Sequence, residues 1–309
     1  MKKKNLNANL SQPSEVVHLR HRHNLAKLVR LSEKYAPYDG AFELPYDGLL
    51  AVRASQVQDE ETFMVSKPGL CVVAQGAKAV ASAKEVFEYD ANKLVVYVAE
   101  VPIHVKIAKA TPDEPYLCIV IPIEASMLAE LISKVFPRGV PKRESTRAIY
   151  VGDCNYKIVD STVRMLELIE QQDDMDLLIP LMVEEILIRL LRSPEGASIA
   201  QISIHDSNAY KISKVISWLK SNYIQSIKME ELAKIAGMSI SSFHVHFKEV
   251  TTLTPLQFQK TLRLQEAKNL ITSQMMDISS AALAVGYSSS TQFSREYARM
   301  FGVSPSKDS

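Results

Sequence analysis

The chain has 309 residues, of which 47% are apolar, and 36 Lys and Arg stand against 35 Asp and Glu. This length allows two domains with a core each, and the composition excludes an intrinsically disordered chain. The basic start from Met1 to Asn5 lacks the apolar run of a signal peptide, and the stretch from Leu94 to Ile103 is too short to span a membrane, so we expect a cytoplasmic protein.

The first predicted element is a helix from Pro13 to Tyr35, because Val17, Leu25, Leu28 and Leu31 recur at helical spacing. From residue 49 to residue 123 the sequence changes to short β-rich runs separated by turn residues, which is typical of a sandwich or barrel. The predicted strands are Leu70 to Ala74, Lys78 to Ser82, Val86 to Tyr89, Leu94 to Ala99, His104 to Ala108 and Tyr116 to Ile121.

Three helices are predicted next, at Glu124 to Val135, Tyr156 to Gln171 and Met175 to Leu191. The last is apolar on most of its circumference, so we expect it to be buried on several sides. Packing within the domain and dimerisation are both consistent with this pattern. The polar stretch at 193–207 is the predicted linker between a domain at 1–192 and a domain at 208–309.

Positive charge is concentrated after this linker. From Asn208 onward, twelve Lys and Arg face seven Asp and Glu, whereas the rest of the chain has 24 against 28. A positive surplus helps a domain to neutralise nucleic-acid phosphates, although a solvated surface often shows the same bias.

The C-terminal end contains one pattern twice. Leu232-Ala233-x-x-Ala236-Gly237 precedes Phe243 and Phe247, and Ala281-x-x-Ala284-Val285-Gly286 precedes Phe293 and Tyr297. Each copy predicts a helix, a glycine turn and a second helix, at about 229–249 and 278–300, which is the layout of a helix-turn-helix. Gly237 and Gly286 supply the positive φ of the turns, and Ser239 and Ser288 are the predicted caps of the following helices.

The outer stripe of each second helix is expected to face DNA. Arg295 is the strongest candidate for a base contact, because its guanidinium fork matches the O6 and N7 acceptors of guanine. The predicted DNA-contacting residues are Ser241, His244, Val245, Lys248, Ser290, Thr291, Gln292, Ser294 and Arg295.

A capped helix joins the two units. Thr254, Pro255 and Gln257 form a capping box, and the apolar pattern predicts a helix that continues to Ile271. A stiff connector of this length is expected to hold two probing helices in successive major grooves, about 34 Å apart.

The stretch from Leu232 to Pro305, ending in Phe301-Gly302-Val303-Ser304-Pro305, resembles the DNA-binding domain of the AraC/XylS family of bacterial transcription regulators. The region from Gly69 to Glu124 resembles the N-terminal domain of one branch, which in the family is a cupin-like β-barrel that senses a small molecule or mediates regulation. Segments that also resemble this branch are Ser217 to Leu219, Phe243 to Lys248, Thr254 to Gln257, Leu262 to Ala267 and Gln292 to Tyr297.

The resemblance implies an α+β chain, with a cupin-like barrel or sandwich and flanking helices, followed by an all-α domain of two helix-turn-helix units. It implies a sequence-specific transcription regulator that binds double-stranded promoter DNA and responds to a small-molecule effector. RNA polymerase and a second copy of the chain are left open as partners, and we expect no cofactor. Two departures stand out, because Val245 replaces a common Arg of the branch and Ser290 replaces a common Pro.

Two functions other than transcription regulation are alternatives for this sequence. A metal-dependent cupin enzyme needs converging histidines and carboxylates, but His104 is the one histidine between residues 40 and 125, so we expect neither a metal centre nor enzymatic activity. The pattern of arginines between His18, His21 and His23 indicates a solvated basic face. A ligand-binding or redox-sensing module whose helical end contacts proteins remains the main alternative.

Three residues are the predicted lining of an effector pocket: Tyr97, Tyr116 and Cys118. Simple filling of the core is the competing interpretation, and strand alternation does not decide which face of the Tyr116 strand is interior. The cysteines at 71, 118 and 154 lack metal-ligand spacing, and we expect neither a disulfide nor zinc.

Overall fold

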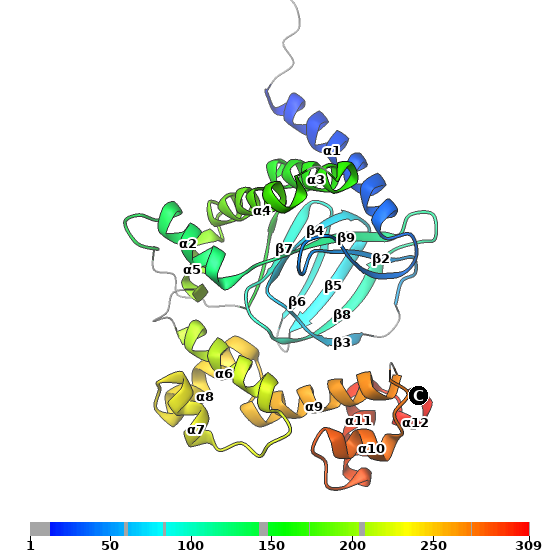
Figure 1. The fold of residues 1–309 in the computed structure, drawn as a ribbon, viewed down its shortest axis with the longest axis vertical. Helices are drawn as coiled ribbons and strands as arrows, with labels where there is room; N and C mark the ends of the chain where they lie inside the picture. Colours follow the sequence, from blue (N-terminus) through cyan, green and yellow to red (C-terminus); the bar gives the residue numbers. More distant parts are fainter. Residues whose placement is uncertain are drawn as a thin grey trace, which may run out of the picture.

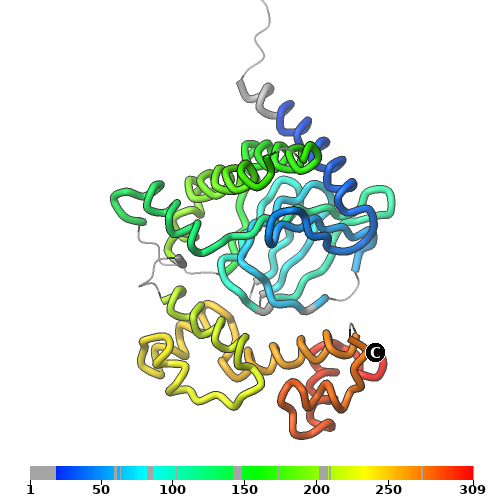
Figure 2. The backbone as a smooth tube through the Cα atoms, viewed as in Figure 1, coloured from blue at the N-terminus to red at the C-terminus, as the bar shows by residue number. Residues whose placement is uncertain are grey.

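The computed structural model describes residues 13–58, 61–82, 85–141, 148–172, 174–203, 208–272 and 274–308. Over these residues the chain forms an N-terminal part with two β-sheets and a C-terminal part made of helices (Figure 1). We call the C-terminal part, from α6 to α12, the reader. The colours in Figure 2 run from blue to green in the first part and from yellow to red in the reader, so each part is one continuous segment.

The first sheet has six strands in the spatial order β1-β2-β9-β4-β7-β10, and all neighbouring strands are antiparallel. Its strands are β1 (Gly40–Glu43), β2 (Leu50–Ala54), β4 (Gly69–Gln75), β7 (Lys93–Tyr97), β9 (Tyr116–Pro122) and β10 (Ile149–Asp153). The second sheet has four strands in the order β3-β8-β5-β6. They are β3 (Thr62–Val65), β5 (Ala77–Ser82), β6 (Glu85–Asp90) and β8 (Pro102–Lys109).

The two sheets form an open sandwich. Among the described residues the outer strands β1 and β10 of the first sheet pair with no strand of the second, so the sheets do not close into a barrel. The six strand segments predicted from the sequence correspond to β4 to β9, and the expectation of a barrel or sandwich is resolved in favour of the sandwich.

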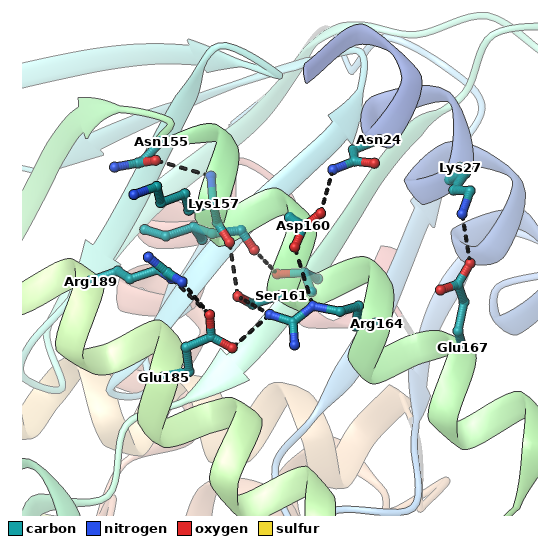
Figure 3. A network of polar contacts seen from close by, with 12 residues as sticks. Asn24, Lys27, Asn155, Lys157, Asp160, Ser161, Arg164, Glu167, Glu185 and Arg189 are labelled. Atoms are coloured by element: carbon teal, nitrogen blue, oxygen red, sulfur yellow. Dashed lines mark hydrogen bonds and ion pairs between the residues drawn. The ribbon is translucent and has the colours of Figure 1, made fainter. Parts of the chain in front are cut away.

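Helices α1 (Pro13–Tyr35) and α3 (Tyr156–Gln171) have the predicted bounds, and α1 lies against β2, β4 and β9 of the first sheet. Polar contacts join the two helices: Asn24 donates to Asp160 at 2.9 Å and Lys27 to Glu167 at 3.1 Å (Figure 3). The first sheet therefore has a helical layer on its outer face, in which α1 and α3 are held together.

Helix α4 (Met175–Leu191) also has its predicted bounds and packs against α2 (Ala125–Val135), α3 and α5 (Gly196–Ser203). Its apolar circumference is only partly buried, since Leu177 and Leu181 are 70% and 58% exposed. Helix α5 lies within the stretch expected to be a linker, where Ile199 and Ala200 are fully buried.

The reader contains seven helices among its described residues, and α9 joins its two halves (Figure 1). They are α6 (Asn208–Asn222), α7 (Met229–Ala236), α8 (Ile240–Thr251), α9 (Pro255–Thr272), α10 (Ile278–Ala284), α11 (Ser290–Phe301) and α12 (Pro305–Asp308).

Buried apolar residues form two separate clusters. One runs from the sandwich through α5 and α6 to the first helix-turn-helix and includes Phe258 and Leu262 of α9. The other belongs to the second unit and includes Leu264, Ala267 and Ile271 of the same helix. Helix α9 thus contributes to both cores, and Tyr223, in the segment after α6, packs against both of them as well.

Candidate nucleic-acid interface

The first helix-turn-helix consists of α7, a turn at Gly237 and α8. Gly237 has φ +62°, and the N–H of Met238 donates to the carbonyl of Ala233, which closes the end of α7. The hydroxyl of Ser239 accepts from the N–H of Ser242 at 3.3 Å and caps α8. The short turn therefore fixes the angle at which α8 leaves α7.

The inner side of α8 is anchored by aromatic residues. Phe243 and Phe247 are fully buried, and the ring of Phe247 lies 5.6 Å from that of Phe258 on α9. The outer side carries Ser241, His244, Val245 and Lys248, all of them exposed, with Val245 at 55%. The predicted groove-facing residues of the first unit thus share one solvent-accessible face.

The second unit consists of α10, a turn at Gly286 and α11. Gly286 has φ +86°, and a Cβ at this position would lie 2.8 Å from the carbonyl oxygen of Ile224. The cap of α11 is Ser289, whose hydroxyl accepts from Gln292, rather than the predicted Ser288. The helix begins one residue later than expected, which places Ser288 within the turn.

Helix α11 is anchored by Phe293 and Tyr297, both fully buried. Ser290, Thr291, Gln292 and Arg295 are exposed, and Ser294 is half-buried. The side-chain amide of Gln292 donates one N–H to Glu296 at 3.3 Å, which leaves its second N–H and its carbonyl oxygen for other partners. Thr291, Gln292 and Arg295 therefore all present polar groups on the exposed face of α11.

Sequence reasoning missed Arg263, which joins the two units. Its Nε donates to the carbonyl of Tyr223 at 2.7 Å, one Nη donates to Ile224 at 2.8 Å, and the other Nη reaches Gly286 at 3.2 Å. One guanidinium thus connects α9, the segment after α6 and the turn of the second unit. Its carbonyl partners lie 23 to 40 residues away in the chain, so no spacing in the sequence indicates them.

Glu296 forms a second polar centre at the base of α11. Its carboxylate accepts from Lys260 of α9 at 2.8 Å and from the hydroxyl of Tyr287 at 2.8 Å, in addition to Gln292. Burial alone would raise the pKa of Glu296, but these hydrogen bonds outweigh it and lower the pKa. The ionised carboxylate therefore holds α11 against α9.

The capping box predicted at the start of α9 is present. The side chain of Gln257 accepts from the N–H of Thr254 at 2.9 Å, and the Thr254 hydroxyl accepts from the N–H of Gln257 at 3.3 Å. Figure 1 shows α8 and α11 near opposite ends of α9. The connector is thus a single 18-residue helix, about 27 Å long at 1.5 Å per residue.

The reader lies directly against the sandwich. Lys220 of α6 forms an ion pair with Glu100 at 2.5 Å, and α11 approaches β3. A cavity of about 340 Å³ lies between His104 of β8 and residues of α9 and α11 that include Lys260 and Arg299. Helix α11 lines this cavity with Glu296, Arg299 and Met300, and Arg299 lies one helical turn after Arg295.

Tyr97, Tyr116 and Cys118 come together between the two sheets, where they adjoin Tyr89 of the second sheet. All three are at least 94% buried, and burial raises the pKa of both tyrosines. This contact assigns Tyr116 and Cys118 to the interior face of β9, the point that strand alternation left undecided.

The cysteines carry no disulfide among the described residues. A hydrogen bond with Cys118 and burial both raise the pKa of the Cys71 thiol, and burial raises that of Cys154 to about 12. These thiols are held in the protonated form, which is the less reactive one. Within the described ranges, no group of three metal-ligating side chains is placed to hold a metal ion, and no helix is long and apolar enough to cross a membrane.

Comparisons with known proteins agree with this architecture. Residues 45–198 match the family model of the AraC-type transcriptional regulator N-terminus, and residues 232–308 match a helix-turn-helix domain model. The virulence regulon transcriptional activator VirF of Yersinia enterocolitica is 23% identical over 246 residues, which cover 78% of this chain and 89% of VirF.

The transcriptional activator RhaS of Escherichia coli is 26% identical over 151 residues, or 49% of this chain and 54% of RhaS. Among solved structures, ToxT of Vibrio cholerae superimposes with a TM-score of 0.56 at 13% identity, covering 84% of this chain and 96% of ToxT. This likeness concerns the fold, including the arrangement of antiparallel sheets followed by a helical helix-turn-helix region.

Proposed function

We propose that this chain, which belongs to the AraC/XylS family of DNA-binding transcription regulators, reads a bipartite promoter site through the outer faces of α8 and α11. The observation that carries the proposal is the pair of exposed faces near opposite ends of α9, each held by a buried aromatic core. A rigid connector between two probing helices suits two successive major grooves.

The two units contribute differently in this proposal. Arg295 reads a guanine, because a bidentate guanidinium contact discriminates between bases by about 1 to 3 kcal/mol. In the first unit, Val245 stands where the branch commonly has an arginine, and its apolar side chain suits a thymine methyl group. Lys248 contacts a phosphate. Ser241, His244, Ser290, Thr291, Gln292 and Ser294 complete the proposed contact surface.

Selection of DNA fragments on the purified full chain, followed by footprinting, tests this proposal. We expect Arg295→Ala to relax base preference at one position by about 1 to 3 kcal/mol. Lys248→Ala should weaken binding to all DNA sequences alike, and it should lower by about 1 the slope of the logarithm of the binding constant against the logarithm of the salt concentration. Arg138→Ala is the matched control, because this exposed arginine lies in the N-terminal part, outside the reader. Equal losses on selected and random DNA for Arg295→Ala would contradict its assignment to a base.

We also propose that a signal received by the N-terminal part controls the reader. Solved structures of ToxT include one with a bound unsaturated fatty acid, which makes a small-molecule effector a reasonable expectation for this chain. Two places suit such an effector: the interior cluster of Tyr97, Tyr116 and Cys118, and the cavity between His104 and α9. Tyr116→Phe removes a hydroxyl from the first and Arg299→Gln removes a cation from the second, so loss of the effector response in one variant locates the site.

We propose that the chain acts in the cytoplasm as a non-catalytic regulator and that it contacts RNA polymerase or a second copy of itself on the promoter. The exposed Leu177 and Leu181 of α4 support the second partner. Mass measurement of the protein with and without its DNA site tests pairing directly.

A further inference from the structure

We propose that the N-terminal part holds a binding site for a phosphate-bearing small molecule, in a cleft between α1, the start of α3 and the end of α4. The cleft has a volume of about 670 Å³, within the range of about 300 to 1,000 Å³ typical of small-ligand pockets. His21, Lys157, Arg189 and Arg192 line it together with the segment from Asp153 to Tyr156. This site is distinct from the interior cluster and from the cavity beside the reader.

Positive charge dominates the lining. Lys157 and Arg192 are exposed, and neither forms an ion pair within the described part of the chain. Arg189 forms an ion pair with Glu185, which lies outside the lining and partly neutralises the charge of Arg189. Asp153, the carboxylate in the described lining, is already paired with Lys93 at 2.5 Å. Two cations therefore remain for a ligand.

The types of donor favour phosphate. An arginine fork and a lysine point charge together match the geometry and charge of a phosphate group. The first turn of α3 carries no acidic residue and points the positive end of a 16-residue helix at the same cleft. The buried hydroxyl of Ser193, also in the lining, has no hydrogen-bond partner among the described residues, so a donor is left over there.

A network of ion pairs shapes the cleft before any ligand arrives. Glu185 accepts from Arg189 and, at 2.7 Å, from Arg164 of α3, which also binds Asp160 at 3.2 Å. Asp160 in turn accepts from Asn24 of α1. Figure 3 shows these residues on neighbouring helices, with Lys157 and Arg189 close to each other. All three helices of the cleft are thus joined, which limits the reorganisation that binding requires.

The cleft is placed to influence the reader without touching DNA. Helices α1 and α3 cover the side of the sandwich that is turned away from the reader, so a duplex along α8 and α11 lies at the other end of the molecule (Figure 1). Arg192, however, is the C-cap of α4, four residues before α5 begins at Gly196. Helix α5 contacts α6, the first helix of the reader.

The turn between Arg192 and α5 is short and hydrogen-bonded. The N–H of Ser193 donates to Leu190 and that of Gly196 donates to Ser193, both at 3.0 Å. A Cβ on Gly196 would lie 2.0 Å from the Leu191 carbonyl oxygen, so glycine is required there. This turn is therefore the proposed link between a phosphate bound at Arg192 and the start of α5.

Titration calorimetry of the full chain with inorganic phosphate and pyrophosphate, at constant ionic strength, tests the site. Arg192→Gln and Lys157→Gln should each weaken pyrophosphate binding at least about tenfold, since hydrogen bonds to charged groups contribute about 1.5 to 3 kcal/mol. Lys109→Gln, at an exposed lysine of β8, is the matched control and should leave binding unchanged. Arg192→Lys should retain part of the affinity, and a circular dichroism melt confirms folding of every variant.

Three results would overturn the proposal. Unchanged pyrophosphate binding in Arg192→Gln and Lys157→Gln removes the site. Loss of binding in Lys248→Gln instead places the anion on the reader. Equal affinity for succinate contradicts the assignment to phosphate. Because operator binding is measured separately on the same variants, failure of this site leaves the proposed DNA reading untouched and is distinguishable from failure of that function.

Discussion

Removal of the Arg263 side chain is the most direct test of how the second unit is oriented. The apolar core of this unit is separate from the core that links the sandwich to the first unit. Arg263 ties the turn at Gly286 to the segment after α6, beside the apolar contact of Tyr223 with the core of the second unit. Arg263→Ala should therefore loosen the second unit while leaving both cores filled.

The expected loss follows from the individual bonds. The bonds to Tyr223 and Gly286 are partly buried, whereas those to Ile224 and Gln225 are exposed and water can replace them. A hydrogen bond to a charged group contributes about 1.5 to 3 kcal/mol. Counting the two partly buried bonds at the lower value gives a decrease of about 3 kcal/mol in the free energy of unfolding of the reader.

Urea unfolding followed by far-UV circular dichroism measures this loss, because the signal includes the helices of both units. Arg299→Ala is the control for loss of an arginine and should change stability by less than about 0.5 kcal/mol. Arg263→Lys keeps the charge without the fork and should fall between the two. If Arg263→Ala unfolds within about 0.5 kcal/mol of Arg299→Ala, the guanidinium does not hold the units together.

The same variant should separate the two halves of DNA binding. Affinity for a site that carries both half-sites should fall at least about tenfold, because the second contact loses effective concentration when its orientation is free. Affinity for an isolated half-site should be unchanged. Equal losses on both DNAs would mean that Arg263 supports one unit internally rather than the alignment of two.

Three further outcomes are expected. Gly286→Ala should destabilise the reader more than Gly237→Ala. Both positions have positive φ, but only the Cβ added at Gly286 would meet a carbonyl oxygen, at 2.8 Å. Equal midpoints of unfolding in urea for the two variants would refute the close approach at Gly286. The pKa of Glu296 is lowered in the folded state, so the stability that its carboxylate contributes should be present above its ordinary pKa of 4.5 and be lost as the pH falls below it. The difference in unfolding free energy between wild type and Glu296→Gln should therefore narrow on acidification. A difference that stays constant from pH 6 to about pH 3 would argue against an ionised carboxylate. Lys220→Gln should raise hydrogen exchange in α6 by up to about fivefold, since a partly exposed ion pair contributes up to about 1 kcal/mol, and adding Glu100→Gln should produce no further increase.

Long periodic helices were predictable to the residue. The bounds of α1, α3 and α4 agree with the sequence because each combines apolar spacing with clear end signals. The capping box at Thr254 and Gln257 was equally legible, since both partners lie within one turn. Features that depend on residues three or four positions apart can therefore be predicted from the sequence.

Other features depend on residues far apart in the sequence. The short edge strand β1 is mostly exposed and has no apolar alternation, and α5 lies in a polar stretch where burial of Ile199 decides its structure. The partners of Arg263 and the convergence of Tyr89 with Tyr116 arise only when distant segments pack. Choosing between an open sandwich and a barrel likewise required knowledge of which strand edges meet.

The proposed groove-facing surface offers few strong base contacts, and this limits how the regulator can achieve specificity. Val245 has no hydrogen-bonding side-chain group, one N–H of Gln292 is engaged by Glu296, and Arg295 is the one arginine in the proposed contact set. A specific site must be favoured over random DNA by about 4 to 10 kcal/mol, while each good bidentate contact adds about 1 to 3 kcal/mol. Because one unit alone does not reach this range, we expect both units to bind together. In the proposed function, their alignment through α9 and Arg263 is the quantity that a signal in the N-terminal part changes, and the contact of α5 with α6 is the proposed route.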